Sequence, residues 1–218
     1  MDHPSVFVLD EHPSIASSFV AELRDTERQS DRLRFRRNME RVGELLAYEL
    51  SKTLTYTAQS IRTPLDTMTV RTLVKQPVLI SVLRAGIPLH QGVLNYFDRA
   101  DNGFIGAFRQ LAEDDTFTIE ADYHAVPLVE GETVILIDPM LATGQTLVQA
   151  IQLLSQHGTP TQLHIIAAIA SAEGVDHVRT AYPDGQLWLG AIDPHLNQKS
   201  YIVPGLGDAG DLAFGPKI

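Results

Sequence analysis

The sequence contains no cysteine, which excludes disulfide stapling. It also lacks an N-terminal stretch that combines basic residues, an apolar run and a small-residue cleavage site. The longest apolar runs, such as Val78 to Leu83 and Ile165 to Ala170, are far shorter than the roughly 20 residues needed to cross a bilayer. From these absences we expect a cytoplasmic protein that does not enter a membrane.

Familiar phosphate-binding and metal-binding motifs are missing as well. Neither the Walker-type loop G-x-x-x-x-G-K-[ST] nor the zinc pattern H-E-x-x-H occurs, and the histidines are scattered singly. Gly205 to Gly210 matches the dinucleotide-binding spacing G-x-G-x-x-G, but only Tyr201 to Val203 precede it before Pro204. That is too short for the buried strand such a loop must follow. We therefore reject a dinucleotide site there.

Positive charge is scarce. The 17 Lys and Arg against 27 Asp and Glu give a net charge of −10, which disfavours a broad nucleic-acid surface. The N-terminal third nevertheless holds a dense group of arginines, namely Arg24, Arg28, Arg32, Arg34, Arg36, Arg37 and Arg41. We interpret this stretch as a solvated helix face or a subunit contact, and an effector or RNA site is the alternative.

The apolar content, 44% of 218 residues, suits one core, so we expect a single domain over residues 1–218. From Leu33 to Leu50 apolar residues recur every three or four positions, which predicts a long helix with one buried stripe. The stripe positions are Phe35, Met39, Val42, Leu46 and Leu50. Thr53 to Thr57 and Thr67 to Leu73 flank Pro64 and predict a hairpin-like arm.

After Pro77 apolar strands alternate with helices. The predicted strands are Val78 to Leu83, Thr133 to Ile137, Leu163 to Ala170 and Leu187 to Ile192. Three helices are predicted: one that follows Gly86 and ends near Phe97, one from Leu147 to Gln156, and one from Glu173 to Tyr182. This alternation predicts an α/β fold with a central, mostly parallel sheet flanked by helices and with ligands at the carboxyl ends of the strands.

The most informative segment runs from Thr133 to Thr146. A buried strand delivers Asp138 to the sheet edge, where its carboxylate can accept hydrogen bonds from two adjacent hydroxyls such as those of a ribose. Thr143 and the residues after it fall at a helix start, where unpaired N–H groups and the helix dipole favour a phosphate. From this segment alone a second interpretation stays open, in which Thr143 is merely an N-cap and Asp138 a surface strand end.

Three motifs taken together resemble the uracil phosphoribosyltransferases. They are Val82-Leu83-Arg84-Ala85-Gly86, Asp138-Pro139-Met140-Leu141-Ala142-Thr143-Gly144 and Tyr201-Ile202-Val203-Pro204-Gly205-Leu206-Gly207-Asp208-Ala209-Gly210-Asp211. Members of this family join uracil to 5-phospho-α-D-ribose 1-diphosphate (PRPP), releasing pyrophosphate and uridine monophosphate (UMP). The resemblance, which runs from about Leu23 to the end of the sequence, implies a phosphoribosyltransferase fold with a small β arm and a C-terminal hood that binds the base.

The resemblance also implies a PRPP site. Arg84, Arg109 and Asp138 are the expected catalytic residues, with Asp138 on the ribose hydroxyls and the arginines on the diphosphate. Arg109 is expected on a mobile loop that includes Glu113 to Asp115. The full set expected to bind PRPP is Arg84, Arg109, Asp138, Pro139, Met140, Leu141, Ala142, Thr143, Gly144, Gln145, Thr146 and Asp208.

Two positions depart from the family's pattern. Phe108 stands where members commonly have a tyrosine, and Gln145 stands where they usually have a glycine. If the backbone at Gln145 requires a positive φ, a residue with a side chain is strained there. We then expect PRPP to bind with altered strength.

The base contacts implied by the family are Ile202, Gly207, Asp208 and Ala209. Uracil presents two carbonyl acceptors and an N–H donor, which backbone groups can pair, and glycine lets the backbone reach the edge of the ring. An N–H aimed at the 4-oxygen would reject cytosine by a factor of about 10⁴. For a glycine-rich tail taken alone, the alternative to a base-binding segment is a flexible C-terminal loop.

Mg²⁺ is the expected cofactor. The family implies that it bridges diphosphate and ribose oxygens of PRPP and contacts Asp208 through water, with no metal site made of protein ligands alone. The sequence shows no Ser/His/Asp or Cys/His set for a nucleophile, so we expect catalysis by orientation and charge.

Two other functions stay open. One is a regulatory protein that binds a pyrimidine nucleotide and acts on RNA or a partner, and the other is a transferase for a different base. The acidic balance argues against RNA, and the tail from Pro204 to Asp211 favours uracil. The family also implies a homodimer or larger homo-oligomer, with GTP as a candidate allosteric activator.

Overall fold

A computed structural model describes residues 5–111 and 117–216, and within them all side chains except those of residues 107–122. The helices are η1 (Leu9–Glu11), α1 (Ile15–Arg24), α2 (Arg32–Ser51), α3 (Ile87–Leu94), α4 (Gln145–Leu154), η2 (Ser155–His157), α5 (Ala172–Ala181) and α6 (Ala209–Phe214). The strands are β1 (Val6–Val8), β2 (Tyr56–Arg62), β3 (Thr67–Leu73), β4 (Val78–Leu83), β5 (Asn102–Leu111), β6 (Phe117–Ala125), β7 (Thr133–Ile137), β8 (Met140–Leu141), β9 (Gln162–Ser171), β10 (Gln186–Asp193), β11 (His195–Leu196) and β12 (Ile202–Val203).

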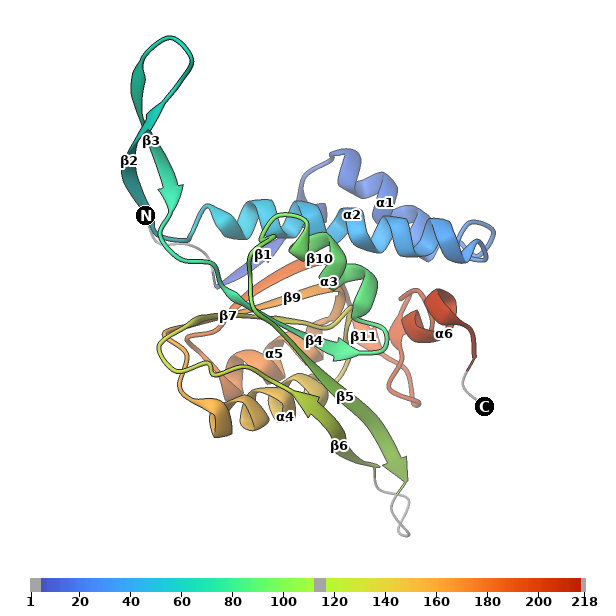
Figure 1. Ribbon diagram of the computed structural model, residues 1–218. Helices are drawn as coiled ribbons and strands as arrows, with labels where there is room; N and C mark the ends of the chain where they lie inside the picture. The colour runs from blue at the N-terminus through green and yellow to red at the C-terminus, as the bar shows by residue number, and fades with distance from the viewer. Residues whose placement is uncertain (1–4, 112–116, 217–218) are drawn as a thin grey trace.

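One sheet forms the centre of the molecule (Figure 1). Its strands follow the order β1-β10-β9-β7-β4-β5-β6, with β8 beside β9, and every pair is parallel except β5 with β6. The predicted strands β4, β7, β9 and β10 lie next to one another and are buried along most of their length. The predicted mostly parallel sheet flanked by helices is therefore confirmed.

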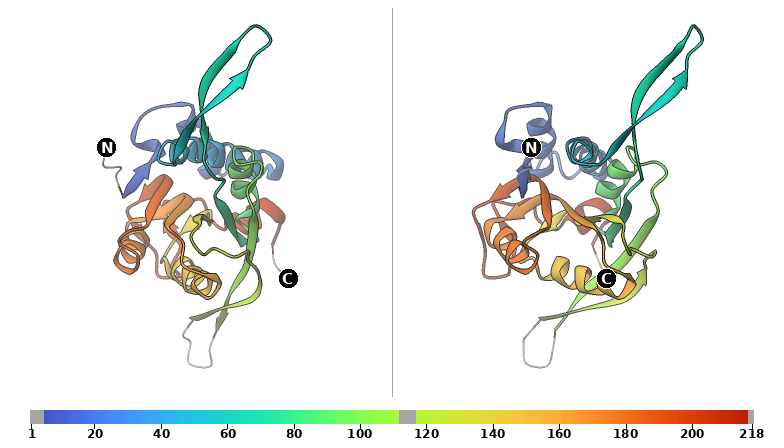
Figure 2. Two further views of the ribbon diagram at one scale, coloured as in Figure 1. Left: turned by 60° about the vertical axis from the view of Figure 1, so that its left-hand side comes forward. Right: turned by 90° about the vertical axis from the view of Figure 1, so that its left-hand side faces the viewer.

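Helices cover both faces of this sheet (Figures 1 and 2). One apolar core joins α1, α2 and α3 to strand residues that include Ile135 and Ile166. The other core joins α4 and α5 to the adjacent strand residues Leu136 and Ile165. Because successive side chains of a strand point to opposite faces, a strand covered on both sides must be apolar throughout. This explains the continuous apolar runs in the sequence.

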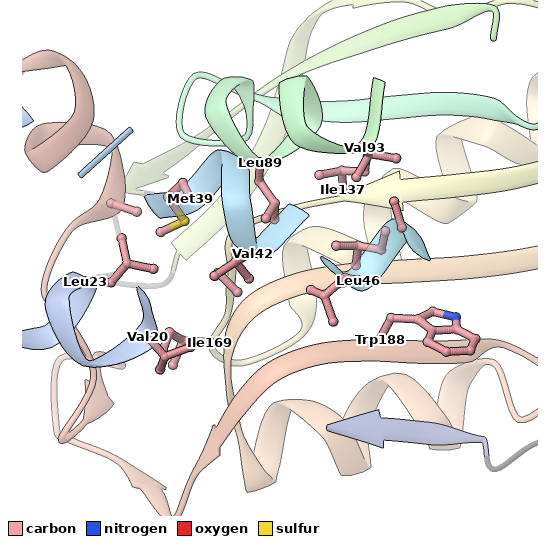
Figure 3. Packing of buried hydrophobic residues seen from close by; sticks show 14 of the residues in the cluster. Val20, Leu23, Met39, Val42, Leu46, Leu89, Val93, Ile137, Ile169 and Trp188 are labelled. Atoms are coloured by element: carbon pink, nitrogen blue, oxygen red, sulfur yellow. The ribbon is translucent and has the colours of Figure 1, made fainter. Parts of the chain in front are cut away.

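Helix α2 lies at the centre of the first core. Its N-terminus is capped by Asp31, whose side chain accepts a hydrogen bond from the backbone N–H of Arg34 at 3.0 Å. The predicted stripe is confirmed, since Phe35, Met39, Val42, Leu46 and Leu50 are all buried. Figure 3 shows part of this stripe packed around Leu89 of α3. Gly92 permits the close approach of α3, because a Cβ there would lie 2.0 Å from the carbonyl oxygen of Glu40.

Strands β2 and β3 pair in antiparallel fashion and project from the body of the molecule as an exposed arm (Figures 1 and 2). The arm is confirmed, and β3 has the predicted range. The predicted start of the first strand at Thr53 is wrong, because the backbone N–H and hydroxyl of Thr53 both bind the carbonyl of Leu50 at the end of α2. The strand begins at Tyr56 instead.

Several elements were not predicted from the sequence: β1, α1, β5, β6 and α6. The short strand β1 joins the sheet edge through parallel pairing with β10. Strands β5 and β6 form a hairpin that extends past the carboxyl ends of the parallel strands (Figure 1). Among the described helices, none combines the length and apolar character that a membrane span requires.

Candidate active site

Polar residues follow the central strands at one edge of the sheet. Asp138 comes directly after β7, Arg84 directly after β4, and Ser171 and Asp193 end β9 and β10. The pairing of Ser81 with Ile137 and of Asp193 with Ser171 brings these strand ends side by side. The loops at this edge are therefore the part of the molecule where distant polar groups can act on one ligand.

Asp138 is almost fully enclosed, with 8% of its surface exposed. Its carboxylate accepts a hydrogen bond from the backbone N–H of Met140 at 3.2 Å. Burial raises the pKa of Asp138 from 3.8 to about 7, and the bond from Met140 opposes part of that rise. The interpretation of Asp138 as a surface strand end is therefore wrong. A buried acceptor with so few partners is suited to receive ligand hydroxyls.

The segment after Asp138 turns sharply into α4. Gly144 is the N-cap residue and adopts φ +79°, so the alternative in which Thr143 caps the helix is wrong. Toward the rest of the described chain, the backbone N–H groups of Thr143, Gly144 and Thr146 donate no hydrogen bond. Unpaired amides at the positive end of a helix form an anion-binding site.

Helix α5 supports this loop from behind. The buried hydroxyl of Ser171 donates to the carbonyl of Ala142 at 2.6 Å, and Nδ1 of His177 lies 2.7 Å from the carbonyl of Thr143. Gly174 permits the close contact, because a Cβ there would lie 2.2 Å from the oxygen of Ala142. The loop carbonyls are thus engaged by α5, which leaves the amides for a ligand. No motif in the sequence indicates these roles of Ser171 and His177.

The expected strain at Gln145 is absent. Gln145 is the exposed first residue of α4, and within the described chain Ser200 is the one residue other than glycine with a positive φ. The left-handed conformation falls on the preceding Gly144 instead. The helix also starts earlier than predicted, at Gln145 rather than Leu147. A side chain at position 145 is therefore compatible with this loop.

Arg84 connects the β4 loop to the C-terminal part of the chain. Its Nη2 donates to Oδ1 of Asp211 at 2.8 Å and to the carbonyl of Gly215 at 2.7 Å. Its Nε is buried and has no hydrogen-bond partner in the described part of the chain. The neighbouring Gly86 is needed for the tight loop itself, since a Cβ there would lie 2.4 Å from the carbonyl oxygen of Val82.

Arg109 lies on the hairpin rather than on an irregular loop. Its backbone belongs to β5 and pairs with Ile119 of β6, so the prediction that placed it in a loop is wrong. The local reason is the antiparallel β5–β6 ladder, which continues to the pair Leu111 and Phe117. The side chain of Arg109 and the predicted loop residues Glu113 to Asp115 lie outside the described part.

Residues 195–215 form the C-terminal hood, which contains β11, β12 and α6. Ile202 and Ala209 anchor it in the first apolar core, with 4% and 3% of their surfaces exposed. Between them Gly207 is exposed with φ +95°, and the side chain of Asp208 caps α6 by accepting from the N–H of Asp211 at 2.9 Å. The core anchors and the helix cap therefore argue against the alternative of a flexible C-terminal loop.

An open pocket of about 530 Å³ borders the hood on the side of α1. Its lining includes Arg24 and Gln29 together with Gly205, Gly207 and Asp208. No residue from 138–146 lines it. This pocket therefore adjoins the predicted base contacts but not the predicted sugar-phosphate loop.

Several arginines of the N-terminal stretch make bonds within the chain. Arg24 pairs with Asp193, Arg34 with Glu22 and Arg37 with Glu40. Arg36 donates to the carbonyl of Ala213 in the hood at 2.7 Å. In the part that the structure describes, no three His, Asp or Glu residues come together as a metal site.

Comparison with known proteins identifies the family to which this chain is similar. A sequence model of the uracil phosphoribosyltransferase family matches residues 9–216. A uracil phosphoribosyltransferase of Porphyromonas gingivalis is 46% identical over 206 residues, covering 94% of this chain and 95% of its own. That of Thermococcus gammatolerans is 39% identical over 217 residues, covering 98% and 94%.

Solved structures support the same fold. The AQ2163 protein of Aquifex aeolicus superposes with a TM-score of 0.85 at 28% identity, covering 98% of this chain and 99% of its own. A purine phosphoribosyltransferase of Pyrococcus horikoshii shares the fold at 14% identity and a TM-score of 0.50, covering 72% and 83%. With an acidic residue after β7, a helix start behind it and a family match over nearly its whole length, this chain belongs to the uracil phosphoribosyltransferase family.

Proposed function

We propose that this chain, acting as one domain over residues 1–218, transfers the 5-phosphoribosyl group of PRPP to uracil and so produces UMP and pyrophosphate. Family membership supports the reaction. The single structural observation that carries it is that one loop holds both the buried carboxylate of Asp138 and, at the start of α4, amides that donate no hydrogen bond within the described chain. These groups suit the hydroxyls and the phosphate of one sugar.

The sugar phosphate would bind along the segment 138–146. Asp138 accepts hydrogen bonds from the ribose hydroxyls, and the amides of Thr143, Gly144 and Thr146 donate to the 5-phosphate, joined by the two threonine hydroxyls. Pro139, Met140, Leu141, Ala142 and Gln145 complete the loop that holds them. Its carbonyls are fixed by α5, so the amides need little rearrangement to receive an anion.

Arg84 and Arg109 would meet the diphosphate, where negative charge grows as the bond to the sugar breaks. Among the described residues the buried Nε–H of Arg84 has no hydrogen-bond partner, and its guanidinium lies between the β4 loop and the hood. Arg109 would approach from the β5–β6 hairpin. Fixed positive charges aimed at a leaving group lower the barrier because they stabilise the transition state more than the bound substrate.

Uracil would be recognised by the backbone of the hood. Gly207 and Ala209 supply a carbonyl and an N–H to the ring edge, Asp208 lies between them, and Ile202 anchors this part of the hood in the apolar core beside the ring. The positive φ of Gly207 turns the backbone in a way that residues with side chains rarely adopt. Cytosine would set its amino group against an N–H donor, so we expect strong discrimination against it.

Mg²⁺ would enter this site as an ion carried largely by the substrate, with Asp208 as its protein contact through water. When bound, it would neutralise diphosphate charge and orient the ribose and diphosphate oxygens. Asp208 is exposed and uses Oδ1 for the helix cap, so its Oδ2 is available to a metal-bound water. The chain's own groups would act by orientation and charge, without a covalent intermediate.

A base-selectivity assay tests this proposal. Purified protein is mixed with Mg²⁺ and PRPP, and each nucleobase is added separately while nucleotide and pyrophosphate are measured. UMP is the expected product. Product with another base but none with uracil would identify a transferase of different specificity, and no product with any base would favour a regulatory nucleotide-binding protein.

Assembly and control complete the proposal. We expect a cytoplasmic homodimer or larger homo-oligomer in which the exposed β2–β3 arm is available for subunit contacts. GTP is the candidate activator. Sedimentation velocity at several protein concentrations tests the assembly, and titration of GTP during turnover tests the activation.

A further inference from the structure

The backbone of Gly205, in the middle of the hood, is held by two residues from distant parts of the chain. We propose that Arg24 and Asp193 are positioning residues for uracil, which fix the segment 205–209 in the geometry that reads the base. This inference rests on the proposed function of that segment. Neither residue belongs to the sequence motifs that identified the site.

The contacts form a closed ring. Arg24, the last residue of α1, donates from Nη1 and Nη2 to the two carboxylate oxygens of Asp193 at 2.7 and 2.8 Å. Nη1 also donates to the carbonyl of Gly205 at 3.1 Å. The backbone N–H of Gly205 in turn donates to Oδ2 of Asp193 at 2.9 Å. Both polar groups of one peptide residue are thus held by a single ion pair.

Gly205 needs this kind of support because it has no side chain to pack. It adopts φ +61°, and a Cβ at this position would lie 2.1 Å from the carbonyl oxygen of Ile202. Its own polar contacts are therefore those of its backbone N–H and C=O. Hydrogen bonds to charged partners are the stronger kind, and a bidentate guanidinium–carboxylate pair also fixes direction.

The ring lies between the open pocket and the end of β10. The pocket lining includes Arg24, Gly205 and Gly207, and Gly205 itself is buried. Asp193 itself is buried, with 4% of its surface exposed. Ile202, Leu206 and Ala209 anchor the segment in the first apolar core, and the ion pair holds the backbone of the intervening Gly205.

The position of Asp193 relates the two halves of the site. Asp193 pairs in register with Ser171 on the neighbouring strand, and Ser171 holds the carbonyl of Ala142 in the phosphate loop. Adjacent strand ends thus fix the sugar-phosphate loop and the base segment. Loss of the Arg24–Asp193 ring should therefore disturb the base side and leave the phosphate side in place.

The test uses Arg24→Gln and Asp193→Asn in the full-length protein, with separate kinetics for uracil and PRPP. We expect the KM for uracil to rise about tenfold in each variant, the loss typical of one charge-assisted hydrogen bond, and the preference for uracil over cytosine to fall. The KM for PRPP should rise less than the KM for uracil, because no ring member hydrogen-bonds to residues 138–146 and, within the segment 205–209, only Asp208 is assigned to PRPP, through a metal-bound water.

Arg34→Gln is the matched control. Arg34 forms an equally short bidentate pair with Glu22 of α1, at 2.7 and 2.6 Å, and within the described chain its side chain donates no hydrogen bond to the hood. It should lower thermal stability without changing the uracil KM or the base preference. Arg24→Lys serves if Arg24→Gln or Asp193→Asn fails to fold, because lysine keeps the charge but lacks the planar fork that reaches Asp193 and Gly205 together.

Each outcome decides between the claims. If the wild-type protein makes no UMP, the proposed function is wrong, whatever the variants do. If the wild type is active and the Arg24 and Asp193 variants keep its uracil KM and base preference, the positioning role is refuted. Equal rises in the KM for uracil and for PRPP would show a general loss of structure and would refute it as well.

Discussion

Asp138→Asn should make the protein more stable at alkaline pH while removing its activity. The carboxyl of Asp138 has a pKa of about 7 in the folded chain against 3.8 without burial. Between these values the folded state binds more protons than the unfolded state. The free energy of unfolding is therefore not reduced by Asp138 below about pH 4, and it falls as the pH rises to about 7. Above that pH the folded protein carries a buried carboxylate at a cost.

The size of this effect follows from the pKa rise. An increase from 3.8 to about 7, at about 1.4 kcal/mol per pK unit, sets an upper limit of about 4 kcal/mol. Asparagine is neutral at every pH and can still accept the hydrogen bond from Met140. Relative to wild type, the variant should gain about 3 kcal/mol of unfolding free energy between pH 4.5 and pH 8.5. The same change removes an ionic acceptor from the ribose hydroxyls, so turnover should fall steeply.

Urea unfolding followed by the fluorescence of Trp188, the single and buried tryptophan, measures the first effect at fixed protein concentration. Asp98→Asn, at a side chain that is 79% exposed, is the control and should show no such gain. A difference between wild type and Asp138→Asn that does not depend on pH would refute the burial argument. Normal PRPP kinetics in the variant would refute the assigned role.

Further substitutions test the loops. Gly144→Ala should lower the unfolding free energy by about 1 kcal/mol more than Gly131→Ala, and it should raise the KM for PRPP. Both sites have positive φ, but only at position 144 would the added Cβ lie against neighbouring atoms, at 3.0 and 3.1 Å. Equal losses of unfolding free energy in the two variants would contradict this. Gln145→Gly should lower the unfolding free energy by less than about 0.5 kcal/mol, because Gln145 is the exposed first residue of α4 and not an interior one. A gain would show strain at this position. Arg84→Lys should lower kcat by about 10²-fold, since one ammonium cannot replace a fixed fork of donors, and an unchanged kcat would remove Arg84 from the chemistry.

The fold class could be predicted from the sequence because its signals are local and strong. Burial on both faces requires continuous apolar strands, and α2 requires a stripe of period close to 3.6, so both patterns are written directly in the chain. Strands β5 and β6 gave no such signal. Their ladder depends on cross-strand pairing between residues that are far less regular in polarity.

The site shows the same division. The sequence by itself indicated Asp138 and the helix start, through a buried strand followed by an acid and then by Gly144, and the family resemblance favoured a sugar-phosphate site over the second interpretation of this segment. The apolar strand β10 also ends in an acid, Asp193, and that signal could have been noticed. Only the tertiary structure decided that the positive φ falls on Gly144 rather than Gln145.

Tertiary structure also decided which distant groups hold the two loops. Arg24 reaches Asp193 and Gly205 across 169 and 181 positions of the chain, and Ser171 reaches Ala142 across 29. No local pattern encodes such pairs, because each bond depends on the order of strands in the sheet rather than on the spacing of residues along it. The local sequence therefore encodes the groups proposed to contact the substrate, and the order of strands in the sheet determines which distant groups hold them in place.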